Sequence, residues 1–338
     1  MSRARDFADL AGSADAGGLT GRNLIINGAM QVAQRGTTSG SKTATGFHTL
    51  DRWEGQASGA TYELDQLTMS DSDRETYGFE KYLHFDVTTG NNNCAVAQKI
   101  EAKNLFHTLG SNQKFTLSFL AKGTNPNGGT VDARFFWTDG TNYGTQTNED
   151  VTLTSSWQQF SITIDAPAVD NSVDVDNASA YLNVSFAQPS GDTSTNAWNI
   201  DVTGVQLEIG EQATPFEHEP YAVTLQKAQR FYYRIESDQY AYFATGSIIA
   251  TSDPTCPMTF PVALRVTPSM TASNTACWYN TAGSIVAVTS PGVHYSSGES
   301  NINTLDMKFA ANASLSNNSN PMLYAFNPAG HLDFDAEL

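Results

Sequence analysis

The stretch VTGVQLEIGEQATPFEHEPY, residues 202–221, begins with a strand pattern and continues as a segment interrupted by Gly and Pro. In its first half, apolar residues alternate with polar ones, which is the period of a strand with one buried face: Val205, Leu207 and Ile209. Gly210 predicts the end of this strand, and Pro220 is placed where a helix can begin. The stretch therefore predicts the last strand of one domain and the start of a connection to another.

The cluster Glu217-His218-Glu219 leaves two interpretations open. In an extended segment Glu217 and Glu219 point to one face and His218 to the other, so the two carboxylates form a candidate cation site. The alternative is a solvated connector between two domains, and this is the interpretation that we favour.

Upstream of this stretch the chain alternates short strand patterns with turns rich in Gly, Asn and Asp. The predicted strands are 60–67, 81–87, 94–100, 114–123, 131–137, 157–164, 180–188 and 198–209. Many short strands with regular turn signals indicate an all-β sandwich or barrel rather than an α/β fold.

Downstream, residues 222–234 (AVTLQKAQRFYYR) predict a linking helix with Leu225, Ala228 and Tyr232 on one face and Phe231 beside them. Strand patterns then return, which predicts a second, smaller β domain over residues 235–338.

The N-terminal residues 2–11 (SRARDFADLA) predict a short helix, with Phe7 among the apolar residues of one face. A helix of this length is marginal in water and would need a partner to dock on. Residues 12–21 form a linker rich in Gly, Ala and Ser. The alternatives, a docking peg on a tether and a frayed tail, stay open.

The chain has 338 residues and a formal charge of −17, with no run of Lys or Arg. A nucleic-acid-binding protein needs a basic face, so nucleic acid is disfavoured as a partner, as is an anionic membrane. We expect no secretion signal and no membrane-spanning helix.

No motif for phosphate binding, nucleophilic catalysis or zinc proteolysis is present, so we expect no enzyme, no cofactor and no metal. The loop 169–179 is a candidate for a structural calcium through Asp170, Asp174 and Asp176, although its spacing matches no fixed motif. A disulfide between Cys256 and Cys277 is conceivable but nothing in the spacing supports it.

Exposed aromatic rings can stack on sugars. Trp137, Trp157 and Trp198 lie in strand patterns and are expected in the core. The candidate glycan-binding residues lie near turns of the second domain: Trp278, Tyr279, His294 and Tyr295.

Three segments resemble one family: NLIINGAMQVAQRG (23–36), DRW (51–53) and QLEIGEQATPFEHEPY (206–221). They are similar to the opening, middle and closing motifs of the jelly-roll module of bacteriophage virion proteins, a module similar to carbohydrate-binding modules. LQKAQRFYYR and FPVALRVTPSMT resemble the helix and C-terminal domain that follow it.

The resemblance implies a jelly-roll β-sandwich over 23–219, a linking helix over 220–234, and a C-terminal β domain over 235–338. Residues 1–22 would dock on other virion proteins, with Arg3, Phe7 and Leu10 as the docking residues. The implied function is a tail fibre or receptor-binding protein that contacts host polysaccharide. It would be assembled in the host cytoplasm and exposed on the particle.

A homotrimer is the family expectation, with Leu225, Phe231 and Tyr232 as contact residues. The alternatives are a head decoration or capsid fibre, and a carbohydrate-binding module or glycan depolymerase component.

Overall fold

The computed structural model describes residues 21–90, 94–105, 113–124, 129–189, 196–238, 242–250, 253–273, 276–279, 285–293, 303–311, 322–325 and 330–338. The chain divides into two compact units, residues 1–224 with Leu338, and residues 225–337. Strands make up most of the regular structure in both units, which confirms the prediction of an all-β protein.

The first unit is an antiparallel sandwich. Its described strands are β1 (Lys42–Phe47), β2 (Glu54–Thr68), β3 (Lys81–Thr89), β4 (Ala95–Glu101), β5 (Lys114–Thr124), β6 (Thr130–Thr138), β7 (Thr147–Thr152), β8 (Gln158–Asp165), β9 (Tyr181–Ala187) and β10 (Trp198–Ile209). They pair in the order β7-β6-β9-β4-β2-β3-β10-β5-β8, and β1 pairs with β2.

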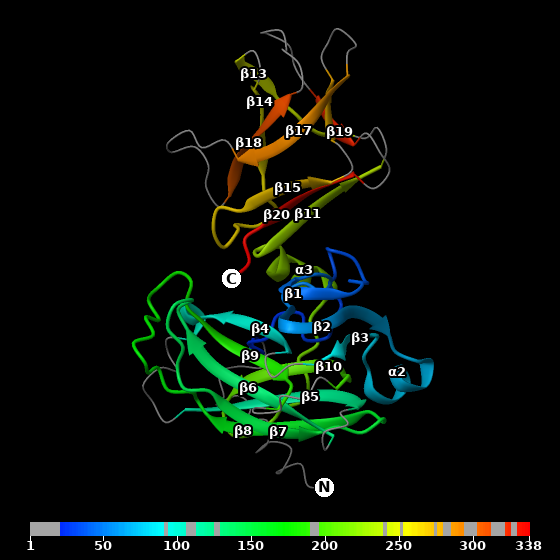
Figure 1. Cartoon of the computed structure of the whole chain (residues 1–338), viewed down its shortest axis with the longest axis vertical. Helices are drawn as coiled ribbons and strands as arrows, with labels where there is room; N and C mark the ends of the chain where they lie inside the picture. Colours follow the sequence, from blue (N-terminus) through cyan, green and yellow to red (C-terminus); the bar gives the residue numbers. More distant parts are fainter. Residues whose placement is uncertain are drawn as a thin grey trace, which may run out of the picture. The chain divides into compact units, whose positions relative to one another are not determined.

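The long strand β2 belongs to both layers of this sandwich. Its residues 54–56 pair with β4, whereas residues 61–68 pair with β3. We call β7-β6-β9-β4 with the start of β2 the first layer, and the end of β2 with β3-β10-β5-β8 the second layer (Figure 1).

The core lies between these layers and follows the period of two in the strands. Phe119 of β5 meets Phe186 of β9 with ring centroids 4.8 Å apart, so side chains of the two layers interdigitate. Burial of one such aromatic side chain contributes roughly 1.5–3 kcal/mol. Trp137, Trp157 and Trp198 are buried, which confirms the expectation for these three residues, and Trp53 is buried as well.

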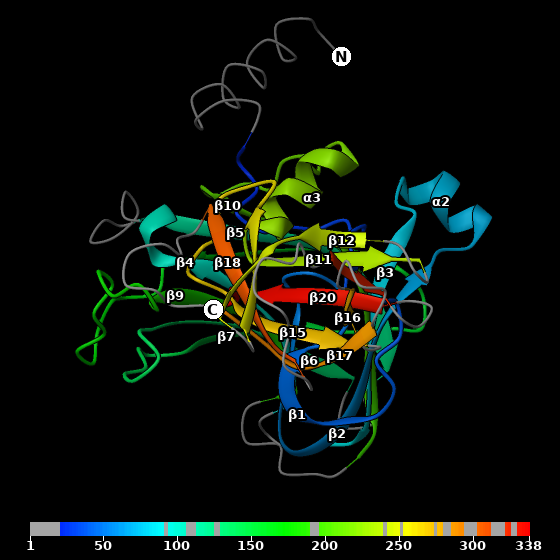
Figure 2. The ribbon, with the colours of Figure 1, turned by 90° about the horizontal axis from the view of Figure 1, so that it is seen from above.

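Three elements were not predicted: β1, β7 and the helix α2 (Asp71–Tyr77). The helix begins at Ser70, whose hydroxyl accepts a hydrogen bond from the backbone N–H of Asp73, and ends at Gly78 in the left-handed conformation with φ of 79°. It buries no residue and therefore has no apolar period to detect. Figures 1 and 2 show it at the periphery of the strands.

The described residues of the second unit form two sheets. Its described strands are β11 (Tyr232–Ser237), β12 (Tyr242–Thr245), β13 (Ser247–Ala250), β14 (Asp253–Thr259), β15 (Ser269–Ser273), β16 (Ala276–Tyr279), β17 (Ile285–Val293), β18 (Thr304–Ala311), β19 (Met322–Ala325) and β20 (Gly330–Asp335). One sheet has the order β11-β20-β15 and the other β12-β19-β16-β17-β18-β14-β13. Phe260 and Phe334 pack at 5.2 Å within its core.

The helix α3 (Tyr221–Gln229) is shorter than predicted. The sequence pattern extended it to Arg234, but the chain enters β11 at Tyr232, which pairs with Asp335 of β20. Aromatic residues favour strands when a partner strand is present, so tertiary pairing overrides the local helical pattern here. Neither helix in the described part of the chain is long and apolar enough to span a bilayer.

Candidate functional site

The opening segment NLIING (23–28) lies along β10. The backbone N–H of Leu24 donates to the carbonyl of Leu207 at 2.9 Å, and that of Val205 donates to the carbonyl of Gly28 at 3.0 Å. A Cβ at Gly28 would lie 2.1 Å from the carbonyl oxygen of Val205, so only glycine fits this approach. The pairing of β10 with β5 is irregular between Thr203 and Gln206, which is where the opening segment meets the strand.

Glu217 fixes the start of the described chain. Its carboxylate accepts hydrogen bonds from the backbone N–H groups of Gly21, Arg22 and Asn23 at 2.5, 3.0 and 3.1 Å. Burial raises its pKa, but these bonds outweigh burial and bring the pKa below its usual value. The interpretation of Glu217 as part of a solvated connector is therefore wrong, because a connector glutamate would not collect three backbone donors from a segment almost 200 residues away.

Gln206 and Glu208 complete this arrangement from the outer face of β10. The backbone N–H of Glu217 donates to Oε1 of Gln206 at 2.8 Å, and the backbone N–H of Thr214 donates to Glu208 at 3.0 Å. Nε of Arg22 lies 3.3 Å from Oε1 of Glu208. We call this set the clasp: residues 21–23 with Gln206, Glu208, Thr214 and Glu217.

The middle motif, DRW (51–53), is joined to the opening motif by hydrogen bonds of Asn27. Its side chain donates to the carbonyls of Val32 at 2.8 Å and Asp51 at 3.1 Å, and Nε1 of Trp53 donates to the Asn27 carbonyl at 3.3 Å. The three motifs that carry the family resemblance therefore form one hydrogen-bonded closure of the sandwich.

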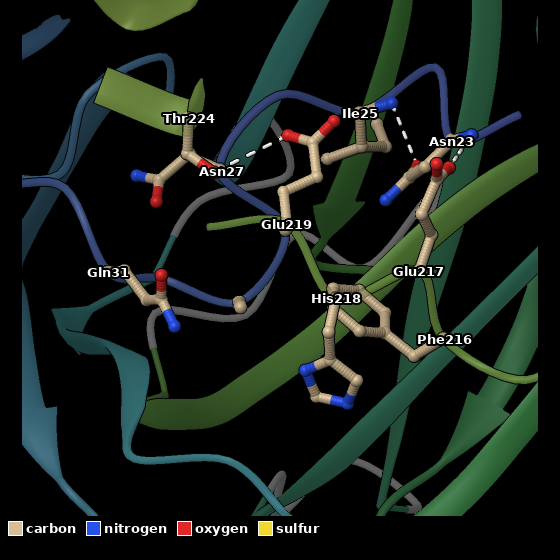
Figure 3. A pocket seen from close by; sticks show the side chains of 11 residues that line it. Asn23, Ile25, Asn27, Gln31, Phe216, Glu217, His218, Glu219 and Thr224 are labelled. Carbon is tan, nitrogen blue, oxygen red and sulfur yellow. Dashed lines mark hydrogen bonds between the residues drawn. The ribbon is translucent and has the colours of Figure 1, made fainter. Parts of the chain in front are cut away.

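A small pocket lies beside the clasp (Figure 3). Asn23, Gln31 and Glu219 are among the residues that line it, and the ring of exposed His218 packs against Phe216 at 4.9 Å. Its volume of about 20 Å³ suits one water molecule and is far too small for a sugar ring. Among the described residues no group of three His, Cys, Asp or Glu side chains could hold a metal ion.

The outer face of the first layer is the second candidate site, and we call it the first-layer face. Cross-strand pairing places its side chains in three rows: Tyr143–Thr138–Tyr181–Glu101, Phe136–Asn183–Lys99, and Asn148–Arg134–Ser185–Ala97–Glu54. Residues opposite each other in an antiparallel pair point to the same face. Aromatic rings thus gather at one end of the face. Most of the polar groups that follow along the strands are buried, among them Asn183 at 0% and Ser185 at 2% exposed, whereas Lys99 and Asn148 are partly exposed.

The charges on this face are paired within the protein. Nζ of Lys99 lies 3.0 Å from Oε1 of Glu54, and the same ammonium lies 5.2 Å from the centre of the Tyr181 ring. Arg134 faces Asp132 at 3.5 Å, and burial lowers the pKa of Arg134 against the opposing effect of that carboxylate. These pairs are largely buried and leave little net charge on the face.

Tyr143 is the exposed member of the aromatic group. Its side chain is 58% exposed, whereas Tyr181 and Phe136 are half-buried beside it. The rings of Phe136 and Tyr143 have centroids 6.1 Å apart. Burial, together with Glu54 and Tyr143, raises the pKa of the Tyr181 hydroxyl, so this group stays a neutral donor and acceptor near neutral pH.

The loop predicted as a calcium candidate has another arrangement. Asp170 accepts from the backbone N–H and the hydroxyl of Thr145 at 2.7 and 2.5 Å. Asp174 accepts from the backbone N–H of Asp176 at 3.1 Å. These carboxylates hold backbone and side-chain donors of the surrounding loops.

On the outer face of the second layer, Nδ1 of His84 lies 2.5 Å from Oδ1 of Asp201, whose other oxygen lies 3.5 Å from Nζ of Lys122. The hydrogen bond to Asp201 raises the pKa of His84 against the effect of burial. This is an ion pair on the surface of a sheet.

None of the docking, glycan-binding and oligomer-contact residues predicted from the sequence is among those of the clasp or the first-layer face. Arg3, Phe7 and Leu10, like His294 and Tyr295, lie outside the described residues, and Trp278 and Tyr279 belong to β16, of which only the backbone is described. Leu225 is half-buried, while Phe231 and Tyr232 are each 2% exposed within the chain. Contact between copies through these three residues stays a prediction. Cys256 is a buried thiol that is not in a disulfide, so the bridge to Cys277 is excluded.

No family model matches the chain, and a search of curated proteins finds no relative. Solved structures with similar folds include a CBM4 module, at 20% identity over 38% of this chain and 84% of that chain, with a TM-score of 0.27. The family 11 carbohydrate-binding module of a Clostridium thermocellum cellulosomal cellulase matches at 14% identity over 52% and 98%, with a TM-score of 0.33.

A third similar structure is the enzymatically active domain of tailspike protein 4 of bacteriophage CBA120. It matches at 14% identity over 56% of this chain and 22% of that chain, with a TM-score of 0.32. Scores of this size carry no functional information, so the function is inferred from the chain's own residues.

Sequence reasoning did not find Tyr143 or the clasp. Tyr143 lies in the turn DGTNYG between two strand patterns, and the only signal was an aromatic residue within a run of turn-forming residues. The signal for the clasp was the regular placement of Gln206 and Glu208 on the polar side of the last strand, together with Thr214 and Glu217 after it.

Proposed function

We propose that this chain is a non-catalytic glycan-binding protein whose first-layer face receives the sugar chain. The observation that carries the proposal is the exposure of Tyr143, at 58%, in register with Tyr181 and next to Phe136. A flat aromatic ring packs against the apolar face of a sugar ring, and the partly exposed Tyr181, Lys99 and Asn148 beside it supply hydrogen-bonding groups for its hydroxyls.

The charge pairs favour an uncharged glycan. Lys99 with Glu54, and Arg134 with Asp132, already neutralise one another on this face. Among the described residues of this face a charged sugar would meet no unpaired opposite charge, and the net charge of −17 repels polyanions at longer range.

The proposed setting is a bacteriophage particle, as a tail fibre or receptor-binding protein exposed on the virion. Support comes from the resemblance of the three motifs, because the segments that carry it are joined by hydrogen bonds in one closure of the sandwich. In this setting residues 1–22 dock on other virion proteins, and the assembly is a homotrimer. A head decoration shares these features, and imaging of particles with a labelled C-terminus separates the two locations.

Binding is tested by affinity electrophoresis of the full chain in gels containing hydroxyethyl cellulose, galactomannan, dextran or alginate. We expect retardation by at least one neutral polymer, insensitive to salt, and its loss in Tyr143→Ala. Tyr221→Ala is the matched control, because Tyr221 is 55% exposed at the start of α3 and is not a residue of the first-layer face. Retention of binding in Tyr143→Ala, or retardation by alginate alone, would refute this assignment of the site.

A further inference from the structure

Tyr143 is carried by residues 139–146, which connect β6 to β7, and this connection is held by two carboxylates. Oδ1 of Asp139 accepts from the backbone N–H groups of Thr141 and Asn142 at 2.8 and 2.7 Å. Its Oδ2 accepts from the side chain of Asn142 at 2.9 Å and from the backbone N–H of Asp174 at 3.0 Å. All four acceptor positions of one buried carboxylate are therefore used to fix the loop.

Asp170 holds the other side of Tyr143. It accepts from both donors of Thr145, two residues after the tyrosine. The side chain of Asn171 donates to the carbonyl of Tyr143 itself at 3.2 Å, and the N–H of Gly144 donates to the carbonyl of Trp137 at 2.8 Å. The backbone on both sides of the exposed ring is thus tied to the sandwich.

The loop 169–179, which contains Asp170, has an unusual backbone conformation. Asn171 and Ser172 have φ of 51° and 62°, a region that residues with a side chain seldom occupy. Such conformations persist where surrounding contacts over-determine them. Here the contacts are those that hold the Tyr143 connection, while the ring that they present stays in solvent.

We propose that Asp139 and Asp170 are positioning residues, which hold Tyr143 in its binding orientation before a glycan arrives. The proposal rests on the proposed function of the first-layer face. A ring that is already fixed loses less conformational freedom on binding. Asp139 and Asp170 therefore raise the affinity for the glycan without touching it. The loop 169–179, a candidate for a structural calcium, would in this proposal hold Tyr143.

The test compares Asp170→Ala with Asp170→Asn and Asp176→Ala. Asp170→Ala removes both acceptors for Thr145. Asp170→Asn can still accept from the backbone N–H and can donate to the hydroxyl, because a hydroxyl also accepts. Asp176→Ala removes an exposed carboxylate of the same loop that does not hold Thr145. Two quantities are measured on the full chain: amide hydrogen exchange over residues 141–145 without ligand, and affinity for the neutral polymer that retards the wild type.

We expect Asp170→Ala to exchange faster over residues 141–145 and to bind about tenfold more weakly, with an unchanged unfolding midpoint. Asp170→Asn and Asp176→Ala should match the wild type. Wild-type affinity in Asp170→Ala would overturn the positioning role while leaving the proposed function intact. A fall in unfolding midpoint matched by Asp170→Asn would show a structural role instead. Failure of the wild type to bind any polymer would remove the proposed function and this inference with it.

Discussion

Replacing Glu217 by Gln tests whether the clasp closes the sandwich. The carboxylate accepts three backbone hydrogen bonds, from Gly21, Arg22 and Asn23. The amide keeps one acceptor oxygen and turns an N–H₂ group toward the remaining donor. Hydrogen bonds to a charged group contribute about 1.5–3 kcal/mol and neutral ones about 0.5–1.5 kcal/mol. Since Glu217 is partly exposed, we expect the free energy of unfolding to fall by about 1–3 kcal/mol at neutral pH.

The assay is urea unfolding followed by tryptophan fluorescence in a Trp278→Phe background, in which every remaining tryptophan belongs to the sandwich. Exposed Glu211→Gln is the control, with an expected change within about 0.5 kcal/mol.

The loss of stability caused by Glu217→Gln should become smaller as the pH falls. The folded-state pKa of Glu217 lies below its usual value of 4.5. Its contribution is therefore present above pH 4.5 and is lost as the pH falls through the folded-state pKa. The difference in stability between wild type and variant should narrow on acidification. Equal differences at pH 7 and at pH 3, or none at pH 7, would refute the role of the carboxylate.

Two further substitutions probe the sandwich. Gly28→Ala places a methyl group against the carbonyl of Val205 and should lower the free energy of unfolding by about 3 kcal/mol, measured by the same urea titration; an unchanged midpoint would contradict the close approach. His84→Gln removes the ion pair with Asp201. Because the folded-state pKa of His84 is raised, the stabilisation is complete below about pH 6.5 and is lost as the pH rises through the folded-state pKa, so the variant should lose more stability at pH 6 than at pH 9. A larger loss at pH 9 would contradict this direction.

Local patterns predicted the strands well because each strand of the sandwich has an apolar side that faces the core. The last strand was predicted over residues 198–209, and β10 has these bounds. Val205 and Leu207 are buried as the alternation indicated. The alternation did not show that Gln206 and Glu208, on the opposite side of the same strand, are buried as well.

Their burial comes from contacts that no local pattern encodes. Glu217 is bonded to residues 194–196 positions earlier, and Asn23 to residues 182 and 184 positions later. A polar residue whose partners lie this far away looks like an exposed residue in the sequence, which is why Glu217 was assigned to a connector. The end of α3 was predicted too far along the chain for a similar reason, since the strand partner of Tyr232 lies more than 100 residues further on.

The sequence predicted the type of residue in the proposed binding site but not its position. The sequence supported an expectation of sugar stacking by exposed aromatic residues, but it directed attention to the second domain. Tyr143 depends on the register between β6 and β9 and on a turn closed by Asp139, and both are properties of the folded sheet.

The most direct test of glycan binding by the first-layer face is an NMR titration of the ¹⁵N-labelled chain. The ligand is a soluble oligosaccharide of whichever neutral polymer retards the protein. We expect the largest shift changes on the amides of Phe136, Tyr143 and Tyr181. Shift changes confined to residues 276–295, or no saturable change at millimolar ligand, would contradict it.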